Sequence, residues 1–180
     1  MKKIIYINIA LIIFLISCGG SEAEILTVNK INPIDSIFNY ESLTNSGFKK
    51  SKSYKIDELP EAISAYYGWK VVGTEGRKDF EIRIYNSHED AIEFGKFYAD
   101  EATGENAIIR KSDASWKEGI KDRRTISTPT DGGSIGAAIG SKSSPKYGDY
   151  IIYGNLIILC EGWDTKESIL RCSSFVNNLK

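Results

Sequence analysis

The sequence has 180 residues, of which 23 are Lys or Arg and 24 are Asp or Glu, so the formal net charge at pH 7 is −1. This balance gives no electrostatic reason to expect a nucleic acid partner. The length suits a single domain with a hydrophobic core. One histidine, His88, excludes any site that needs two imidazoles, and no HExxH or Walker pattern occurs.

The first residues have the pattern of a secretory signal. Lys2 and Lys3 precede an almost entirely apolar run from Ile4 to Ile16. A basic start followed by an apolar core of about 7–15 residues is typical of a signal peptide, and such a run is too short to span a bilayer comfortably. We therefore expect residues 1–17 to be removed during export.

The apolar run ends in Leu15-Ile16-Ser17-Cys18, which resembles the lipobox of bacterial lipoproteins. The resemblance implies that the Cys18 thiol receives a diacylglycerol, that cleavage follows Ser17, and that fatty acids such as palmitate complete the anchor. Several acyl chains anchor a protein stably, whereas one binds marginally. The alternative is an ordinary signal peptide with a chance cysteine. The lipobox reading predicts an exported protein held by Cys18 in a lipid bilayer, the outer membrane or the cell membrane, and facing away from the cytoplasm.

The remaining chain divides into a lipidated tether, residues 18–24, and a single domain, residues 25–180. Cleavage would remove Lys2 and Lys3 and leave 21 basic against 24 acidic residues, so the mature chain has no polybasic segment that would hold anionic lipid. Residues 128–146 are rich in Gly and Ser and are predicted to be a loop. Both a mobile surface loop and a loop that contacts a ligand or partner remain open for this segment.

The first elements of the domain are predicted to be a helix and a strand. Asp57 can cap a helix over residues 57–67, Pro60 suits its first turn, and Gly68 can end it. Residues 80–85 alternate between apolar and polar side chains, which indicates a half-buried strand.

A longer helix is predicted to follow. Ser87 can cap it and Gly104 can end it. Its buried stripe is formed by apolar and small residues at helical spacing, namely Ala91, Phe94, Gly95, Tyr98 and Ala102. Weaker patterns indicate a strand over residues 107–110 and a short helix over residues 113–122.

The clearest pattern predicts a β-hairpin near the C-terminus. Residues 150–153 and 156–159 are apolar on both faces and flank Gly154-Asn155, where a leading Gly suits a type II′ turn. Strands that are apolar on both faces are typically central and covered on both sides. Asp164 can then cap a terminal helix. We predict an α+β fold, a mainly antiparallel sheet with a central C-terminal hairpin and helices packed against it.

Cys160 and Cys172 are predicted to form a disulfide. Once Cys18 is lipidated they are the only two thiols left, and export places them in an oxidising compartment. Cys172 lies about 10 Å into the terminal helix, and the four residues that precede this helix can span about 13 Å, so a helix folded over the sheet brings the two cysteines level. Two buried free thiols are the alternative. We expect no metal site, because two cysteines and a distant His88 suit zinc poorly.

Three segments are similar to an uncharacterised family of exported bacterial proteins: residues 80–104, 116–124 and 145–150. The similarity covers most of residues 57–180. It implies a common fold and compartment but no activity, so no catalytic residue and no cofactor is carried over.

Aromatic residues form the candidate ligand or partner surface. Tyr66, Tyr67 and Trp69 lie together in the sequence, and Trp163 follows the hairpin. Rings with polar tips can form a platform for a sugar or a peptide, although packing in the core is the alternative. The sequence therefore favours a non-enzymatic envelope lipoprotein that binds a protein, a glycan or a small ligand. An immunity or inhibitor lipoprotein is the alternative, and an envelope hydrolase has little basis in a chain with a single histidine.

Overall fold

The structure is a computed structural model that describes residues 27–127 and 142–179. The predicted signal peptide, Cys18, the predicted tether and most of the Gly- and Ser-rich segment lie outside the described residues. Within the two described ranges, no helix combines the length and the apolar character that a membrane crossing requires.

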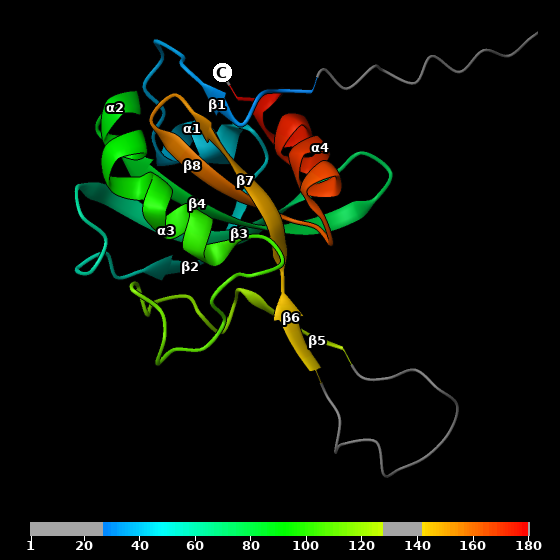
Figure 1. The fold of residues 1–180 in the computed structure, drawn as a ribbon. Helices are drawn as coiled ribbons and strands as arrows, with labels where there is room; N and C mark the ends of the chain where they lie inside the picture. Colours follow the sequence, from blue (N-terminus) through cyan, green and yellow to red (C-terminus); the bar gives the residue numbers. More distant parts are fainter. Residues whose placement is uncertain (1–26, 128–141, 180) are drawn as a thin grey trace, which may run out of the picture.

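A six-stranded sheet forms the centre of the molecule, with the strand order β1-β7-β8-β4-β3-β2 (Figure 1). Its neighbouring strands are antiparallel except for β1 and β7, which are parallel. The strands are β1 (Ile31–Asn32), β2 (Lys49–Tyr54), β3 (Ala62–Val72), β4 (Gly76–Tyr85), β7 (Tyr147–Tyr153) and β8 (Leu156–Glu161). A separate hairpin consists of β5 (Arg124–Ser127) and β6 (Lys142–Pro145), so the described end of the Gly- and Ser-rich segment is a strand.

Helices cover both faces of the sheet and confirm the predicted α+β class. The first face carries α1 (Tyr40–Asn45) and α4 (Thr165–Val176), and the second carries α2 (His88–Asp90), a π-helical turn (Ala91–Gly95) and α3 (Lys96–Ala102). Residues 104–123 form turns that also pack on the second face, where Trp116 joins a small cluster with Tyr54 and Ala65.

The predicted hairpin is confirmed as β7 and β8. Tyr153 pairs with Leu156 across the turn Gly154-Asn155, and Gly154 has the positive φ of 53° that a type II′ turn needs at this position. Ile158 is buried in the core of the first face and Ile152 in that of the second. The hairpin is therefore covered on both sides, as its apolar sequence predicts.

The helical segment between Ser87 and Gly104 is also confirmed, with a π-helical turn in its middle. The Ser87 hydroxyl accepts the backbone N–H of Asp90, and Gly104 has the positive φ of 82° of a helix-ending glycine. A Cβ on Gly95 would lie 2.5 Å from the Tyr85 hydroxyl oxygen. Only glycine lets the π-helical turn approach the sheet this closely.

Two predicted helices and one predicted strand are wrong. Residues 57–67 do not form a helix: the chain turns at Glu61, whose φ is +56°, and β3 then pairs with both β2 and β4. Residues 113–122 are turns, and residues 107–110 are not a strand. In each case tertiary packing outweighs a weak local pattern.

The predicted disulfide between Cys160 and Cys172 is present. The Cα atoms lie 5.7 Å apart, because α4 folds back over β7 and β8 as expected. Asp164 caps α4 by accepting the backbone N–H of Glu167 at 2.8 Å. A covalent loop of this length stabilises a fold by about 3 kcal/mol in the chain-entropy model.

Candidate functional site

The four aromatic residues of the predicted surface do not share one surface. Tyr66 lies on the first face of the sheet, with its ring centre 5.0 Å from that of Tyr40. Tyr67 and Trp69 lie on the second face, because successive side chains of a strand alternate. Trp163 lies beyond β8 at the start of α4, and 74% of it is exposed.

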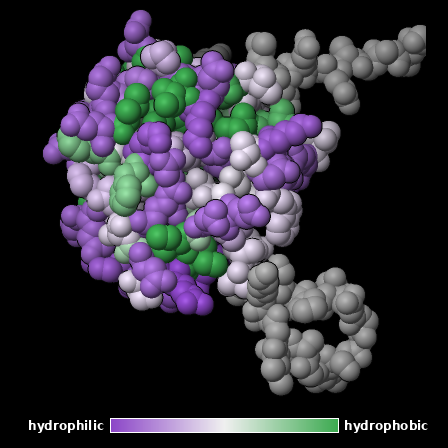
Figure 2. Space-filling model, in the orientation of Figure 1, coloured by the Kyte–Doolittle hydropathy of each residue, from purple (hydrophilic) through white to green (hydrophobic). Residues whose placement is uncertain are grey.

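Exposed hydrophobic residues are scattered over the described part of the molecule. They come from several elements and are Ile31, Ile37, Ile63, Val71, Phe97 and Trp163. Figure 2 shows that on the viewed face the hydrophobic side chains form separate groups among hydrophilic ones. Trp163 is therefore not part of a broad apolar docking face. What distinguishes Trp163 is that it lies beside a cleft.

A cleft of about 660 Å³ lies beside Trp163 and is called the Trp163 cleft below. Three stretches of chain line it: residues 104–109 after α3, residues 143–148 of β6 and β7, and residues 162–165 at the start of α4. None of these stretches is close to the others in sequence.

Backbone contacts hold the three stretches together. The N–H of Gly104 donates to the carbonyl of Tyr147 at 2.9 Å, and the N–H of Gly162 donates to the carbonyl of Lys146 at 3.0 Å. A Cβ on Gly148 would collide with the backbone of Asp164, so glycine is required where β7 lies against the start of α4. These contacts hold the lining stretches against one another.

The lining of the Trp163 cleft is mixed: Ala107, Ile109 and Pro145 are apolar, and among the described residues no Lys or Arg lines it. It offers an indole, carboxylates and hydroxyls, which belong to Glu105, Ser143, Ser144, Tyr147, Trp163, Asp164 and Thr165. Ser144 Oγ and Tyr147 Oη are buried and have no hydrogen-bond partner within the described residues. Burial raises the pKa of Tyr147 well above its ordinary value, so its hydroxyl stays protonated inside the core and is not exposed to the cleft. The exposed indole of Trp163 and the exposed Glu105, Ser143 and Thr165 suit a ligand that is rich in hydroxyl groups.

A network on the second face braces β6 near the cleft. Lys146 Nζ donates to Asp79 Oδ2 at 2.7 Å and to the Tyr67 hydroxyl at 3.1 Å. The backbone N–H of Asp79 donates to Glu161 Oε2 at 2.8 Å. Tyr67 therefore contributes a hydrogen bond that positions the end of β6, and it does not line the Trp163 cleft.

A buried ion cluster lies deeper on the same face. Glu81 is fully buried and accepts hydrogen bonds of 2.7–3.0 Å from the guanidinium groups of Arg83 and Arg123. Both guanidinium groups also lie over the ring of Trp116, at 4.9 and 4.6 Å from its centre. Burial alone would raise the pKa of Glu81, but the attraction of Arg123 and Arg83 outweighs it and holds the pKa below its ordinary value of 4.5. The cluster fastens residues 104–123 to the sheet.

His88 has a structural partner. Its Nδ1 lies 2.9 Å from the carbonyl oxygen of Gly154, so Nδ1 carries the hydrogen and donates it. The contact ties the start of α2 to the turn of the β7–β8 hairpin.

No curated protein and no solved structure matches the chain. Apart from β1 and its flanking residues, the described fold lies within residues 39–180. The Trp163 cleft and the disulfide lie within the same range. This is the range that matches DUF6810, a family of unknown function, and the match spans well over half of the chain. The chain therefore belongs to the DUF6810 family.

Proposed function

We propose that the protein is an exported, lipid-anchored binding protein that holds a glycan of the cell envelope in the Trp163 cleft. The observation that carries the proposal is the exposed indole of Trp163 beside a cleft lined by carboxylates and hydroxyls. The role is binding without catalysis.

The cysteines support export and anchoring. A disulfide between Cys160 and Cys172 suits an oxidising compartment outside the cytoplasm. Leu15-Ile16-Ser17-Cys18 supplies the expected attachment point for lipid, and the bilayer is then the permanent partner of Cys18.

The chemistry of the cleft supports a glycan. A sugar ring presents C–H groups on its face and hydroxyls around its edge, so it can stack on an indole while its hydroxyls pair with oxygen atoms of the protein. Glu105 and Thr165, which are both exposed, can provide such pairing at the cleft wall. The carboxylates of Glu105 and Asp164 in the lining disfavour anionic polymers.

The engagement of Asp164 supports a role without catalysis. Its carboxylate caps α4 through the backbone N–H of Glu167, and a carboxylate committed to a helix cap is a poor acid or base catalyst. Glu105 would then act as a hydrogen-bond acceptor for ligand hydroxyls.

Trp163→Ala is expected to weaken glycan binding at least tenfold, about 1.4 kcal/mol, because stacking on the indole is lost. The measurement is isothermal titration of the full chain with tetra-N-acetylglucosamine. Phe97→Ala is the matched control, since Phe97 is an exposed aromatic residue on α3 outside the cleft. An unchanged dissociation constant for Trp163→Ala, or an equal loss for Phe97→Ala, would contradict the glycan proposal. Capture of a toxin or lytic enzyme in place of a glycan, after crosslinking in native envelopes, would favour the immunity alternative.

Cys18→Ala is expected to abolish incorporation of labelled palmitate and to leave residues 1–17 attached. The physical reason is that the thiol is the acceptor of the lipid and that cleavage depends on it. Metabolic labelling followed by gel electrophoresis measures both effects, and Cys160→Ser is the control that should keep its label. The anchor is wrong if the wild-type chain takes up no label or if Cys18→Ala labels equally well.

A further inference from the structure

The outer strand of the sheet, β2, is rich in lysine. It has β3 on one side only, and no backbone hydrogen bond joins residues 49–54 to any other part of the described chain. Lys49, Lys50 and Lys52 are exposed on it, and Lys55 follows directly. Its unpaired N–H and C=O groups are therefore available to another strand.

A basic cleft of about 540 Å³ adjoins this strand. Lys52, Ser53 and Tyr54 of β2 line one side of it, and residues 111–124 line the rest. Its charged lining residues are the cations Lys52, Lys111, Lys117, Lys121 and Arg124 and the carboxylates Glu118 and Asp122. Cations predominate here although the whole chain is slightly negative, so the charge is concentrated at this place.

Part of this charge is not used inside the molecule. Asp122 accepts from both Lys52 Nζ and the Tyr54 hydroxyl, and Lys117 Nζ lies 3.5 Å from a carboxylate oxygen of Glu58. Within the described residues, no ion pair involves Lys111, Lys121 or Arg124. These three side chains can meet an external anion.

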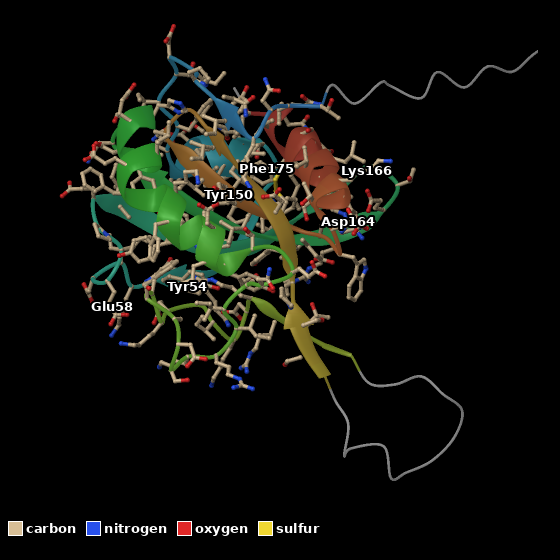
Figure 3. The ribbon with its side chains drawn as sticks, viewed as in Figure 1. Tyr54, Glu58, Tyr150, Asp164, Lys166 and Phe175 are labelled. Carbon is tan, nitrogen blue, oxygen red and sulfur yellow. A yellow bond between two sulfur atoms is a disulfide. The ribbon has the colours of Figure 1, made fainter. Side chains whose placement is uncertain are left out.

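The basic cleft lies away from the anchored end of the molecule. The described chain begins near β1 and α4, whereas β2 lies on the opposite side of the sheet order (Figure 1). Figure 3 likewise shows Tyr54 and Glu58 at the far end of the molecule from Lys166 on α4. A soluble partner therefore reaches the basic cleft more easily than the bilayer does, because the bilayer that holds the proposed tether would lie at the opposite end.

We infer that β2 and the basic cleft together bind an acidic, extended segment of a partner protein, which adds to the sheet as a further strand. Backbone pairing along β2 supplies affinity, and alternate Asp or Glu side chains of the added strand enter the basic cleft. A second copy of β2 is disfavoured, because lysines would then face lysines. The inference does not depend on glycan binding, since the two clefts share no lining residue.

The test measures fluorescence anisotropy of a labelled peptide of alternating Glu and Thr. Two further peptides carry N-methyl groups on the odd or on the even residues. A strand pairs through one set of alternate N–H groups, so one methylated peptide should bind like the parent and the other at least tenfold more weakly. The double variant Lys111→Glu/Lys121→Glu should also lose at least tenfold, whereas Lys166→Glu, an exposed charge on α4, should bind normally.

Three results would overturn the inference. Equal binding of both methylated peptides would show attraction by charge without strand pairing. An equal loss in Lys166→Glu would show that the effect depends on total charge. Phosphatidylglycerol vesicles at matched charge are tested as competitors. If they compete as strongly as the unlabelled peptide, the basic cleft is a lipid-binding surface.

Discussion

Glu81→Gln is expected to lower the free energy of unfolding by about 3–5 kcal/mol, the typical cost of breaking a buried ion pair. Glu81 is the common acceptor for Arg83 and Arg123, both of which are almost fully buried. The neutral amide would leave two buried guanidinium groups without a counter-charge. Urea unfolding at pH 7, followed by circular dichroism, measures the loss. Glu89→Gln, at an exposed position on α2, is the control and should change stability by less than about 0.5 kcal/mol.

The same carboxylate predicts how stability depends on pH. Its pKa in the folded protein lies below 4.5, the ordinary value, so near and below this pH the unfolded chain binds more protons at Glu81 than the folded one. The contribution of Glu81 to stability is therefore complete above about pH 4.5 and declines as the pH falls through the folded pKa. Glu81→Gln should lose this part of the acid dependence. An unfolding curve of Glu81→Gln that matches the wild type at both pH 7 and pH 4 would contradict the assigned role of the cluster.

The sequence predicts the hairpin and the terminal helix well because their signals are local. Residues 150–159 combine two apolar runs with a Gly-led turn, and these features act over a few residues. The bridge between Cys160 and Cys172 follows from the lengths of the elements that carry them. Such features require no knowledge of distant neighbours.

The ion cluster could not be read from the sequence. Within residues 80–85, alternation correctly assigns Phe80, Ile82 and Ile84 to one buried face. It assigns Glu81 and Arg83 to the opposite face, which a half-buried strand exposes to solvent. Their partner Arg123 is some 40 residues further along the chain. Only the packing of residues 104–123 on the second face buries these charges, and the pattern of a single strand contains no sign of it.

The prediction of a helix at residues 57–67 failed for a related reason. Pro60 and Gly68 occupy positions that suit the start and the end of a helix. In the structure, Gly68 instead lies within β3 where the ring of Phe48 approaches, and a Cβ there would collide with it. Pairing with strands on both sides decides the conformation of this segment.

The candidate site is predictable only in part. The sequence predicts Trp163 as a surface residue from its residue type and its place after the hairpin, and the structure puts it beside a cleft. Glu105 and Ser144 reach the same cleft from segments remote from Trp163 in sequence. The basic cleft likewise depends on the packing of residues 111–124 beside β2. Local patterns identify single residues, whereas the clefts arise from contacts between distant segments.

Ile158→Ala is expected to lower the free energy of unfolding by about 2–5 kcal/mol, which is a large share of the total stability of a domain. Ile158 is fully buried at the centre of the sheet, where it pairs with Ile82 of β4 and Ile151 of β7. Its carbonyl lies beneath the disulfide, 3.5 Å from the sulfur of Cys172. Close packing from both neighbouring strands and from α4 leaves little room for the cavity to collapse, so the loss should include a cavity cost.

Ile152→Ala is expected to cost a similar amount on the second face, where Ile152 is fully buried and pairs with Ile157. Ile63→Ala is the matched control, because Ile63 has the same side chain on β3 but is 52% exposed, and its loss should stay below about 1 kcal/mol. Urea unfolding of the oxidised protein, with equal slopes for all variants, measures the three losses. If both buried sites lose less than about 1 kcal/mol, the hairpin does not form the centre of the core.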